Sequence, residues 1–192
     1  MVKFGISPDI VEYAPAVLIR KAVLCERAGF DALWEGDHIL PWHHTNGHCS
    51  DVMIILEAYL QATEKITVVG LVPPIGVRRQ PVDVALTFAT MANLHPNRVA
   101  LTVAAGEAMN ERAATGIWFS PRERVERVRE ATKLIRMCWE SRDYFHFKGK
   151  YFDSFFTSSI SLKNPYRYTA QLTAVECSKL RGSSAMDSYQ SA

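Results

Sequence analysis

Residues 66–103 read ITVVGLVPPIGVRRQPVDVALTFATMANLHPNRVALTV. Ile66–Val72 is rich in β-branched residues and predicts a strand, and Pro81–Leu94 predicts a helix that begins at a proline. Pro96-Asn97 then turns the chain into a second strand, Val99–Val103. A strand, a helix and a second strand in this order predict a parallel βαβ unit.

The same alternation precedes this unit. Val2–Ile6 and Ala32–Glu35 predict two earlier strands, each followed by a helix, from Pro15 to Arg27 and from Val52 to about Thr63. Strands and helices that alternate through most of a chain indicate an α/β fold with a parallel sheet and helical crossovers.

Capping residues mark several helix ends. Gly29 is expected to end the first helix, and Ser50 or Asp51 to cap the second. A later helix is expected to start with Ser120 as its cap, Pro121 at its first position and Glu123 reaching back to the cap. The apolar residues expected on the buried side of the first helix are Val17, Leu18, Leu24, Cys25 and Ala28.

The pattern changes after this long helix. Tyr144–Phe147 and Tyr151–Phe156 flank a Lys-Gly-Lys turn and predict a hairpin. One further strand is possible at Tyr168–Val175. From Tyr166 onward the periodicity otherwise fades and residues 178–192 have no apolar face, so we expect residues 166–192 to be a disordered tail.

Composition excludes several classes of function. The net charge of +2 on 192 residues is too small to indicate a nucleic-acid or membrane partner. The longest apolar stretch, Ile66–Val77, is interrupted by two prolines and is too short to span a bilayer. The four cysteines show no CxxC spacing and no disulfide framework, so we expect a cytoplasmic protein.

A histidine-rich segment follows the second predicted strand. Residues 36–49 read GDHILPWHHTNGHC and contain four of the six histidines. Imidazole and thiolate groups bind zinc, but this spacing matches no zinc motif, and adjacent His43 and His44 would point apart. We therefore expect no metal here. By itself, this segment is most simply a polar loop.

A second polar segment, residues 104–111, AAGEAMNE, follows the strand Val99–Val103. Functional groups of parallel α/β folds collect at the carboxyl ends of strands. Gly106 would allow close backbone approach, and Glu107 could be an acid or base or merely a helix-dipole partner. The helix expected to begin near Asn110 would offer free amides to a phosphate.

In combination, the two segments resemble the signature of the coenzyme F420-dependent enzymes of the luciferase-like superfamily, nearest their alcohol- and sugar-phosphate-oxidising members. The carrying motifs are Asp37-His38, Pro41-Trp42, Arg79-Gln80-Pro81, Phe88-Ala89-Thr90-Met91, Pro96-Asn97-Arg98-Val99, Gly106-Glu107-Ala108-Met109-Asn110-Glu111, Arg124-Val125-Glu126-Arg127 and Phe147-Lys148-Gly149-Lys150-Tyr151. The resemblance covers residues 1–165.

This resemblance implies a (β/α)8 TIM barrel, of which residues 1–165 would be about the N-terminal half, with 144–156 as a hairpin insertion. We expect a barrel that stops before it closes, through a shifted or shortened reading frame or because a partner chain completes it. The exposed edges of Val2–Ile6 and Val99–Val103 are expected to drive homodimerisation or aggregation.

The resemblance also assigns roles to residues. His38 and Trp42 would line the face of the deazaflavin where hydride moves, Glu107 would be an acid or base, and Glu12 an additional carboxylate. The residues implied for coenzyme binding are Asp37 (holding His38 or a ring atom), Leu71 and Val72 (at a bulge with a non-proline cis peptide), Ala105, Gly106, and Asn110 (at the phosphate). Ala104-Ala105 stand where the family usually has a glycine and a hydroxyl residue, which could weaken or shift binding.

The function implied is hydride transfer between a small alcohol and coenzyme F420, with an apolar wall of Trp42, Met109 and Val72 excluding water. Two other luciferase-like functions are alternatives, an FMN-dependent monooxygenase and an enzyme like methylene-tetrahydromethanopterin reductase. The alternative from a different class is a catalytically inactive remnant or half-barrel association module.

Overall fold

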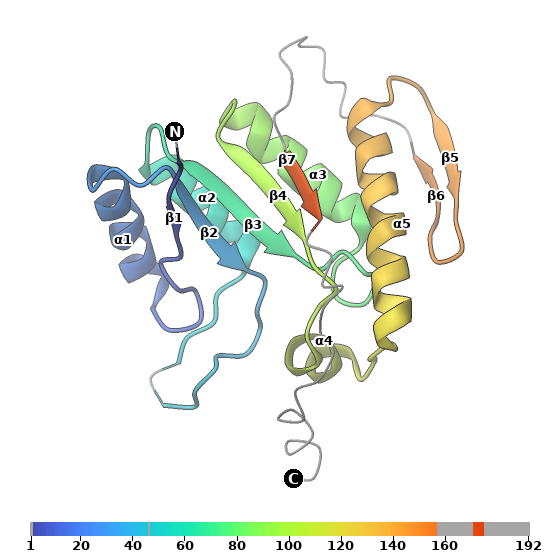
Figure 1. The fold of residues 1–192 in the computed structure, drawn as a ribbon, viewed down its shortest axis with the longest axis horizontal. Helices are drawn as coiled ribbons and strands as arrows, with labels where there is room; N and C mark the ends of the chain where they lie inside the picture. Colours follow the sequence, from blue (N-terminus) through green and yellow to red (C-terminus); the bar gives the residue numbers. More distant parts are fainter. Residues whose placement is uncertain (1, 46, 157–170, 175–192) are drawn as a thin grey trace.

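A computed structural model describes residues 2–45, 47–156 and 171–174 (Figure 1). Within these ranges, five strands form one parallel sheet in the order β1-β2-β3-β4-β7, and two strands form a separate antiparallel hairpin. The strands of the sheet are β1 (Gly5–Ile6), β2 (Ala32–Gly36), β3 (Thr67–Val72), β4 (Val99–Val103) and β7 (Gln171–Ala174), and those of the hairpin are β5 (Phe145–Lys148) and β6 (Asp153–Phe156).

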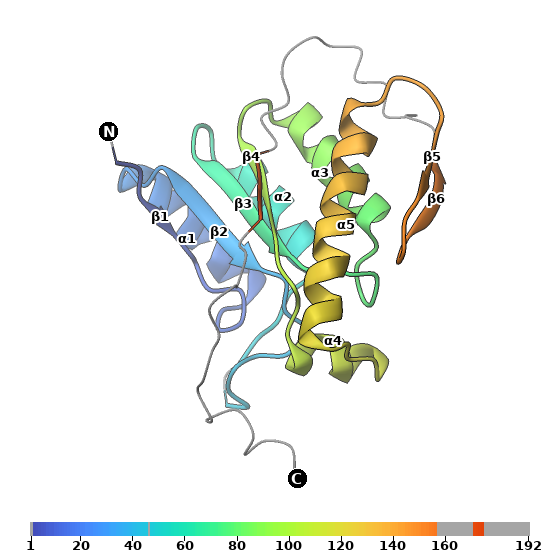
Figure 2. The same cartoon turned by 45° about the vertical axis from the view of Figure 1, so that its right-hand side comes forward.

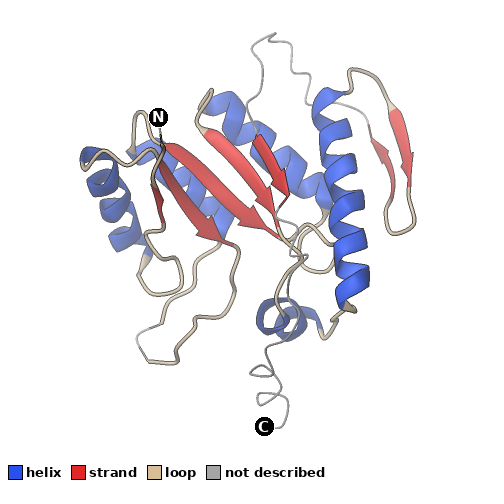
Figure 3. Cartoon of the chain, viewed as in Figure 1, coloured by secondary structure: helices blue, strands red, loops and turns tan. Residues whose placement is uncertain are grey.

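Five helices occur in the same ranges, namely α1 (Pro15–Arg27), α2 (Val52–Ala62), α3 (Pro81–Leu94), α4 (Ala108–Thr115) and α5 (Pro121–Glu140). The helices α1, α2 and α3 lie along one face of the sheet, and α5 packs beside α3 (Figures 2 and 3). In the part of the chain that the structure describes, the other face of the sheet carries no helix, and no helix is long and apolar enough to cross a lipid bilayer.

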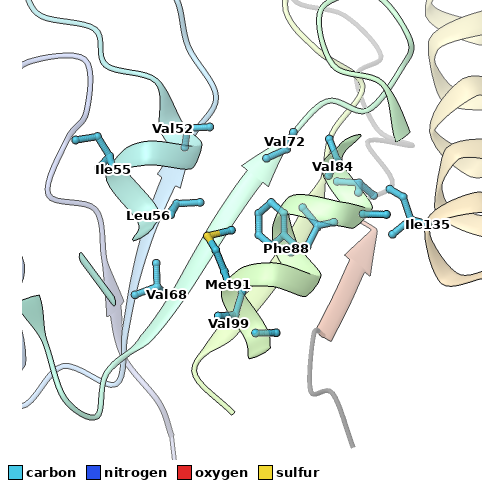
Figure 4. Packing of buried hydrophobic residues seen from close by; sticks show 14 of the residues in the cluster. Val52, Ile55, Leu56, Val68, Val72, Val84, Phe88, Met91, Val99 and Ile135 are labelled. Atoms are coloured by element: carbon cyan, nitrogen blue, oxygen red, sulfur yellow. The ribbon is translucent and has the colours of Figure 1, made fainter. Parts of the chain in front are cut away.

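The core lies between the sheet and its helices, because alternate strand side chains point to that side. Val68 and Val72 of β3 are buried there with Phe88 of α3 (Figure 4). Gly70 lies between them in sequence, and a Cβ at this position would come within 2.6 Å of the Phe88 ring and 2.7 Å of Leu56. The glycine therefore allows two large side chains to close over the strand.

Three of the expected caps are confirmed. Gly29 ends α1 with a φ of 87°, a left-handed conformation that favours glycine. The Asp51 carboxylate accepts hydrogen bonds from two backbone amides in the first turn of α2, at 2.9 and 3.4 Å. Ser120 caps α5 by accepting a hydrogen bond from the amide three residues later.

Three expectations about helix side chains are wrong. Leu24 is 61% exposed, because α1 packs through the fully buried Leu18 and Ala22, and Leu24 lies off that stripe. Ala28, which was also expected on the buried side, is exposed at the C-cap of the helix. Glu123 does not reach back to its cap; its carboxylate lies 3.0 Å from the guanidinium of Arg127, one turn along the helix. A charged partner at this spacing competes effectively with a backbone amide.

The edges of the sheet also differ from expectation. β1 is limited to two residues, and the strand predicted at 168–175 is present as β7, which pairs with β4 from Ala100↔Gln171 to Val103↔Ala174. The edge of β4 is therefore covered, contrary to the prediction that it would be open. The rest of the predicted tail lies outside the described residues.

Arg98 ties the end of α2 to the sheet. Its guanidinium donates to the carbonyls of Leu60 and Thr63 at 3.2 and 2.9 Å, and to the carbonyl of Ile66 at 3.1 Å. These bonds satisfy carbonyls that a helix end leaves without partners. Asn97 turns the chain at a φ of 64° and so delivers Arg98 to this position.

Two glutamates of α5 hold the hairpin against that helix. The Glu130 carboxylate accepts hydrogen bonds from the backbone amides of Lys150, Tyr151 and Phe152, at 3.0, 2.9 and 2.8 Å. Glu126 accepts from the Lys150 ammonium at 2.9 Å and from the Tyr151 hydroxyl at 2.5 Å. The hairpin is therefore a docked insertion, with its turn fixed by charge-assisted bonds.

We expect Phe88→Ala to lower the free energy of unfolding by about 3–5 kcal/mol, because the ring is fully buried and its removal leaves a cavity over β3. Leu86→Ala is the matched control on the same helix, where the side chain is 46% exposed, and should cost well under half as much. Urea denaturation of both variants measures the difference. Equal losses would show that the sheet–helix core is not packed as described.

Candidate active site

The carboxyl ends of β2, β3 and β4 lie together at one end of the sheet. Backbone amides join them there: Asp37 donates to the carbonyl of Leu71 at 3.0 Å, and Ala104 donates to the carbonyl of Val72 at 3.0 Å. The long loop after β2 and helix α4 after β4 extend from this same end (Figure 1). The two polar segments of the sequence are therefore neighbours in space.

An imidazole, a carboxylate and an indole meet at this end. The Nε2 atom of His38 lies 3.6 Å from an Oε of Glu107, and the His38 and Trp42 ring centroids are 4.9 Å apart. The His38 side chain is 13% exposed, that of Glu107 is 50% exposed, and Trp42 is 57% exposed. The cluster therefore has a largely covered imidazole with an open, partly apolar rim.

Asn110 is the centre of the hydrogen bonds in this cluster. Its Oδ1 atom accepts from the backbone amides of Ile39 and Leu40, at 3.0 and 3.4 Å. Its Nδ2 group contacts His38 Nδ1 and donates to Glu107, both at 3.2 Å. Asn110 is 2% exposed, and these four bonds use all the donors and acceptors of its side chain. The side chain therefore has no donor left for the coenzyme phosphate that the sequence analysis assigned to it.

A buried ion-pair network lies next to the cluster of His38, Glu107 and Trp42. Both carboxylate oxygens of Asp37 receive hydrogen bonds from the guanidinium groups of Arg78 and Arg79, at 2.9 to 3.1 Å. Arg79 also donates to Asp51 at 2.8 Å, and Arg78 lies 3.5 Å from Glu111. The hydrogen bonds that Arg79 donates to Asp37 are the main reason why the pKa of Arg79 is raised. Asp37 therefore holds two arginines, where it was expected to hold His38 or a ring atom.

The loop after β4 is held in a conformation that favours glycine. Gly106 has a φ of 76°, and a Cβ at this position would lie 3.0 Å from Glu111 and 3.2 Å from Ile75. The carbonyls of Ala105 and Gly106 each lie 3.5 Å from the guanidinium of Arg124. Burial raises the pKa of Glu111, against the opposing effect of Arg78. A glycine at position 106 therefore allows the backbone to pass close to the side chains of Glu111 and Ile75.

The remaining predicted site residues do not join the cluster directly. Leu71 is half-buried on the helix-free face of the sheet, whereas Val72 points into the core and is fully buried (Figure 4). Successive side chains of β3 point to opposite faces of the sheet, so Val72 faces the helices. It therefore cannot form part of the apolar wall around a coenzyme that was expected of it. No cis peptide bond occurs among the described residues, so the bond expected to be cis between Leu71 and Val72 is trans. Glu12 is exposed in the turn after β1.

An open cavity of about 370 Å³ borders His38. Its lining residues come from the loop after β2, the start of α2 and the loop after β3, and they are His38, Ile39, Cys49, Ser50, Asp51, Arg78 and Arg79. Across the residues that are described, no three or more His, Cys, Asp or Glu side chains gather as a metal site would require. Histidines 43, 44 and 48 are exposed.

Residues 1–166 match the family described as luciferase-like monooxygenase. The chain belongs to this family. The predicted fold class is thereby confirmed: the parallel sheet with its helices is part of a luciferase-like barrel, and the described sheet is not closed.

Three of the similar proteins are coenzyme F420-dependent enzymes. The F420-dependent glucose-6-phosphate dehydrogenase of Amycolatopsis mediterranei is 38% identical over 154 residues, which are 80% of this chain and 46% of that enzyme. A solved F420-dependent secondary alcohol dehydrogenase, in complex with an F420–acetone adduct, is 39% identical with a TM-score of 0.76, over 79% of this chain and 46% of that one. The coenzyme F420-dependent tetrahydromethanopterin reductase of Methanopyrus kandleri, at 21% identity and a TM-score of 0.65 over 82% of this chain and 45% of that one, shares the fold. The chain spans about half the length of these relatives.

Arg78 is a residue of the site that the sequence analysis missed. It follows an apolar strand and precedes Arg79 and a helix-opening proline. Two adjacent arginines in such a place must find carboxylates if they are buried, because unpaired buried charges are very costly. Asp37, at the end of the neighbouring strand, was the available partner.

Asp37→Asn should lower the free energy of unfolding by about 3–5 kcal/mol, because it leaves two largely buried guanidinium groups without their main carboxylate. Asp51→Asn is the matched control: it keeps an oxygen for the helix cap and removes only the partly exposed pair with Arg79, worth less than about 1 kcal/mol. Chemical denaturation at neutral pH compares the two.

The control also has a defined pH dependence. Burial is the largest single influence on Asp51 and opposes its ionisation, but the hydrogen bond and charge of Arg79 together with the amides of Ile54 and Met53 outweigh it, and the pKa of Asp51 is lowered. Its stabilising effect is therefore complete above the ordinary aspartate pKa of about 3.9 and is lost as the pH falls through the lowered folded value. The stability difference between wild type and Asp51→Asn should vanish in that window; a difference that persists at lower pH would contradict it.

Proposed function

We propose that this chain contributes the N-terminal half of the active site of a coenzyme F420-dependent oxidoreductase that acts on a small alcohol. The observation that carries the proposal is the cluster of His38, Glu107 and Trp42 around the buried Asn110, at the carboxyl ends of β2 and β4. Its relatives at 38–39% identity are F420-dependent dehydrogenases. When bound, coenzyme F420 would accept or supply a hydride.

The residues present fit a flat, phosphate-bearing coenzyme in two respects. Trp42 offers an exposed ring, and Leu71 offers an apolar side chain on the helix-free face. Helix α4 has no side-chain cap, so the amides of Ala108 and Met109 are available to an anion such as the coenzyme phosphate. The Asn110 side chain bonds to protein groups of this site and not to the coenzyme.

The proton of a substrate hydroxyl would be handled by His38 and Glu107. Hydride transfer to or from a carbinol carbon requires a group that takes or returns the hydroxyl proton. An imidazole and a half-exposed carboxylate 3.6 Å apart can divide that task, one orienting the hydroxyl by a hydrogen bond and the other carrying its proton. Trp42 beside the imidazole would limit access of water to the reacting atoms.

The test uses a completed barrel, made by joining residues 1–165 to the C-terminal half of the Amycolatopsis mediterranei enzyme. We expect reduction of F420 by a secondary alcohol, and we expect His38→Ala to reduce kcat by about 10²–10⁴ with little change in the Kd for F420. His43→Ala, at an exposed histidine of the same loop, is the control and should leave kcat unchanged.

Parallel titrations with F420 and FMN distinguish the two coenzymes by absorbance. Tight FMN binding without F420 binding would replace the proposal with the flavin-dependent alternative. Equal turnover of the His38→Ala variant and the wild type would reduce His38 to a loop-shaping role.

We also propose that the short chain associates with a second copy through the helix-free face of its sheet. On this face, Trp34, Val69 and Ala100 are register partners in one row across β2, β3 and β4. Trp34 is 45% exposed. Parallel sheets are normally covered on both faces, and an apolar row of this kind favours self-association.

Trp34→Glu should therefore shift the chain toward the monomer in analytical ultracentrifugation, because a charge in the middle of the row is costly to bury. Leu24→Glu is the matched control, at a 61% exposed position on α1 among the helices, and should leave the association unchanged. A wild-type chain that is monomeric at every concentration would overturn this proposal and remove support for a half-barrel association module.

A further inference from the structure

We propose that Asn110 fixes the proton of neutral His38 on Nε2, so that His38 acts as a hydrogen-bond donor toward substrate and Glu107 is the proton acceptor. The catalytic meaning of this arrangement rests on the proposed function. The position of the proton rests on the hydrogen-bond geometry alone.

The orientation of the Asn110 carboxamide is set by the backbone. The amides of Ile39 and Leu40 point at one atom of the carboxamide, at 3.0 and 3.4 Å, and a backbone N–H can only donate. That atom must therefore be the oxygen. The NH₂ group consequently faces His38 and Glu107.

The same NH₂ group then determines the state of the imidazole. It has two hydrogens and two neighbours, His38 Nδ1 and a Glu107 oxygen, each at 3.2 Å. A carboxylate is an acceptor, and Nδ1 accepts only if it carries a lone pair. The proton of the neutral His38 ring is therefore on Nε2. Because Asn110 is 2% exposed, water is not free to replace this bond.

With the proton on Nε2, His38 and Glu107 have different roles toward a substrate. The Nε2 atom of His38 lies 3.6 Å from a carboxylate oxygen of Glu107, whose side chain is half exposed. A protonated nitrogen cannot take a proton from a hydroxyl; it donates a hydrogen bond to the substrate oxygen. The carboxylate of Glu107 is the adjacent group that can receive the proton. Asn110 is thus a positioning residue that acts through His38.

Nitrogen-15 NMR of the full 192-residue chain tests the proposal without any coenzyme. The chain is labelled at histidine and studied at about pH 8.5, above the ordinary histidine pKa of about 6.5. His38 is identified by the signals lost in His38→Gln. We expect a single tautomer in the wild type, with Nδ1 in the unprotonated range and Nε2 in the protonated range.

The decisive variant is Asn110→Asp. It keeps an oxygen for the amides of Ile39 and Leu40 but presents a second acceptor to His38, so Nδ1 should move to the protonated range. Asn93→Asp makes the same chemical change at an exposed position of α3 and should leave the His38 signals unchanged. Asn110→Ser, which removes the NH₂ donor, should give a mixture of tautomers and serves if Asn110→Asp does not fold.

A wild-type Nδ1 that is protonated would overturn the proposal. So would a folded Asn110 variant, judged by circular dichroism, whose His38 tautomer is the same as in the wild type. Because these spectra are recorded without coenzyme or substrate, this inference and the proposed function fail by different results.

Discussion

The candidate site depends on one buried carboxylate, that of Asp37, held between the guanidinium groups of Arg78 and Arg79. Asp37 directly follows β2, and the two arginines belong to the loop after β3. Through Asp51 and Glu111 the same arginines reach the first turns of α2 and α4. Four separate segments are thus fixed against each other next to the imidazole that follows Asp37. The main effect of these ion pairs is therefore to hold the segments of the site in fixed positions.

The fold could be predicted from sequence wherever local patterns determine it. The strand–helix alternation, the end of the first helix at Gly29 and a cap at Ser50 or Asp51 depend on a few consecutive residues, and they were predicted from them; the structure has the cap at Asp51. Leu24 was misplaced because the buried stripe of α1 depends on what packs against it. The covering of β4 was missed because strand pairing is a contact between distant segments, here β4 and Gln171–Ala174.

For the site, the sequence indicated which residues would come together but not how they would bond. His38, Trp42 and Glu107 were expected at one end of the sheet, and the structure brings them together there. Asn110 was assigned to the coenzyme phosphate by the family resemblance. Its four bonds go to protein groups, a saturation that depends on the three-dimensional path of the loop after β2. For the same reason, the two arginines around Asp37 could not be predicted.

The docking of the hairpin has a consequence for variation. Glu130 holds residues 150–152 through their backbone amides, which every amino acid except proline provides. Phe147 and Tyr151 are partly buried against the core, and Lys150 pairs with Glu126, so these three are constrained, but the other exposed positions of the hairpin can change without loosening its attachment. Gly149 is the exception, because a Cβ there would lie 2.0 Å from the Glu130 carboxylate. Natural drift or laboratory libraries confined to these exposed positions would therefore alter the surface of the insertion while its anchoring stays the same.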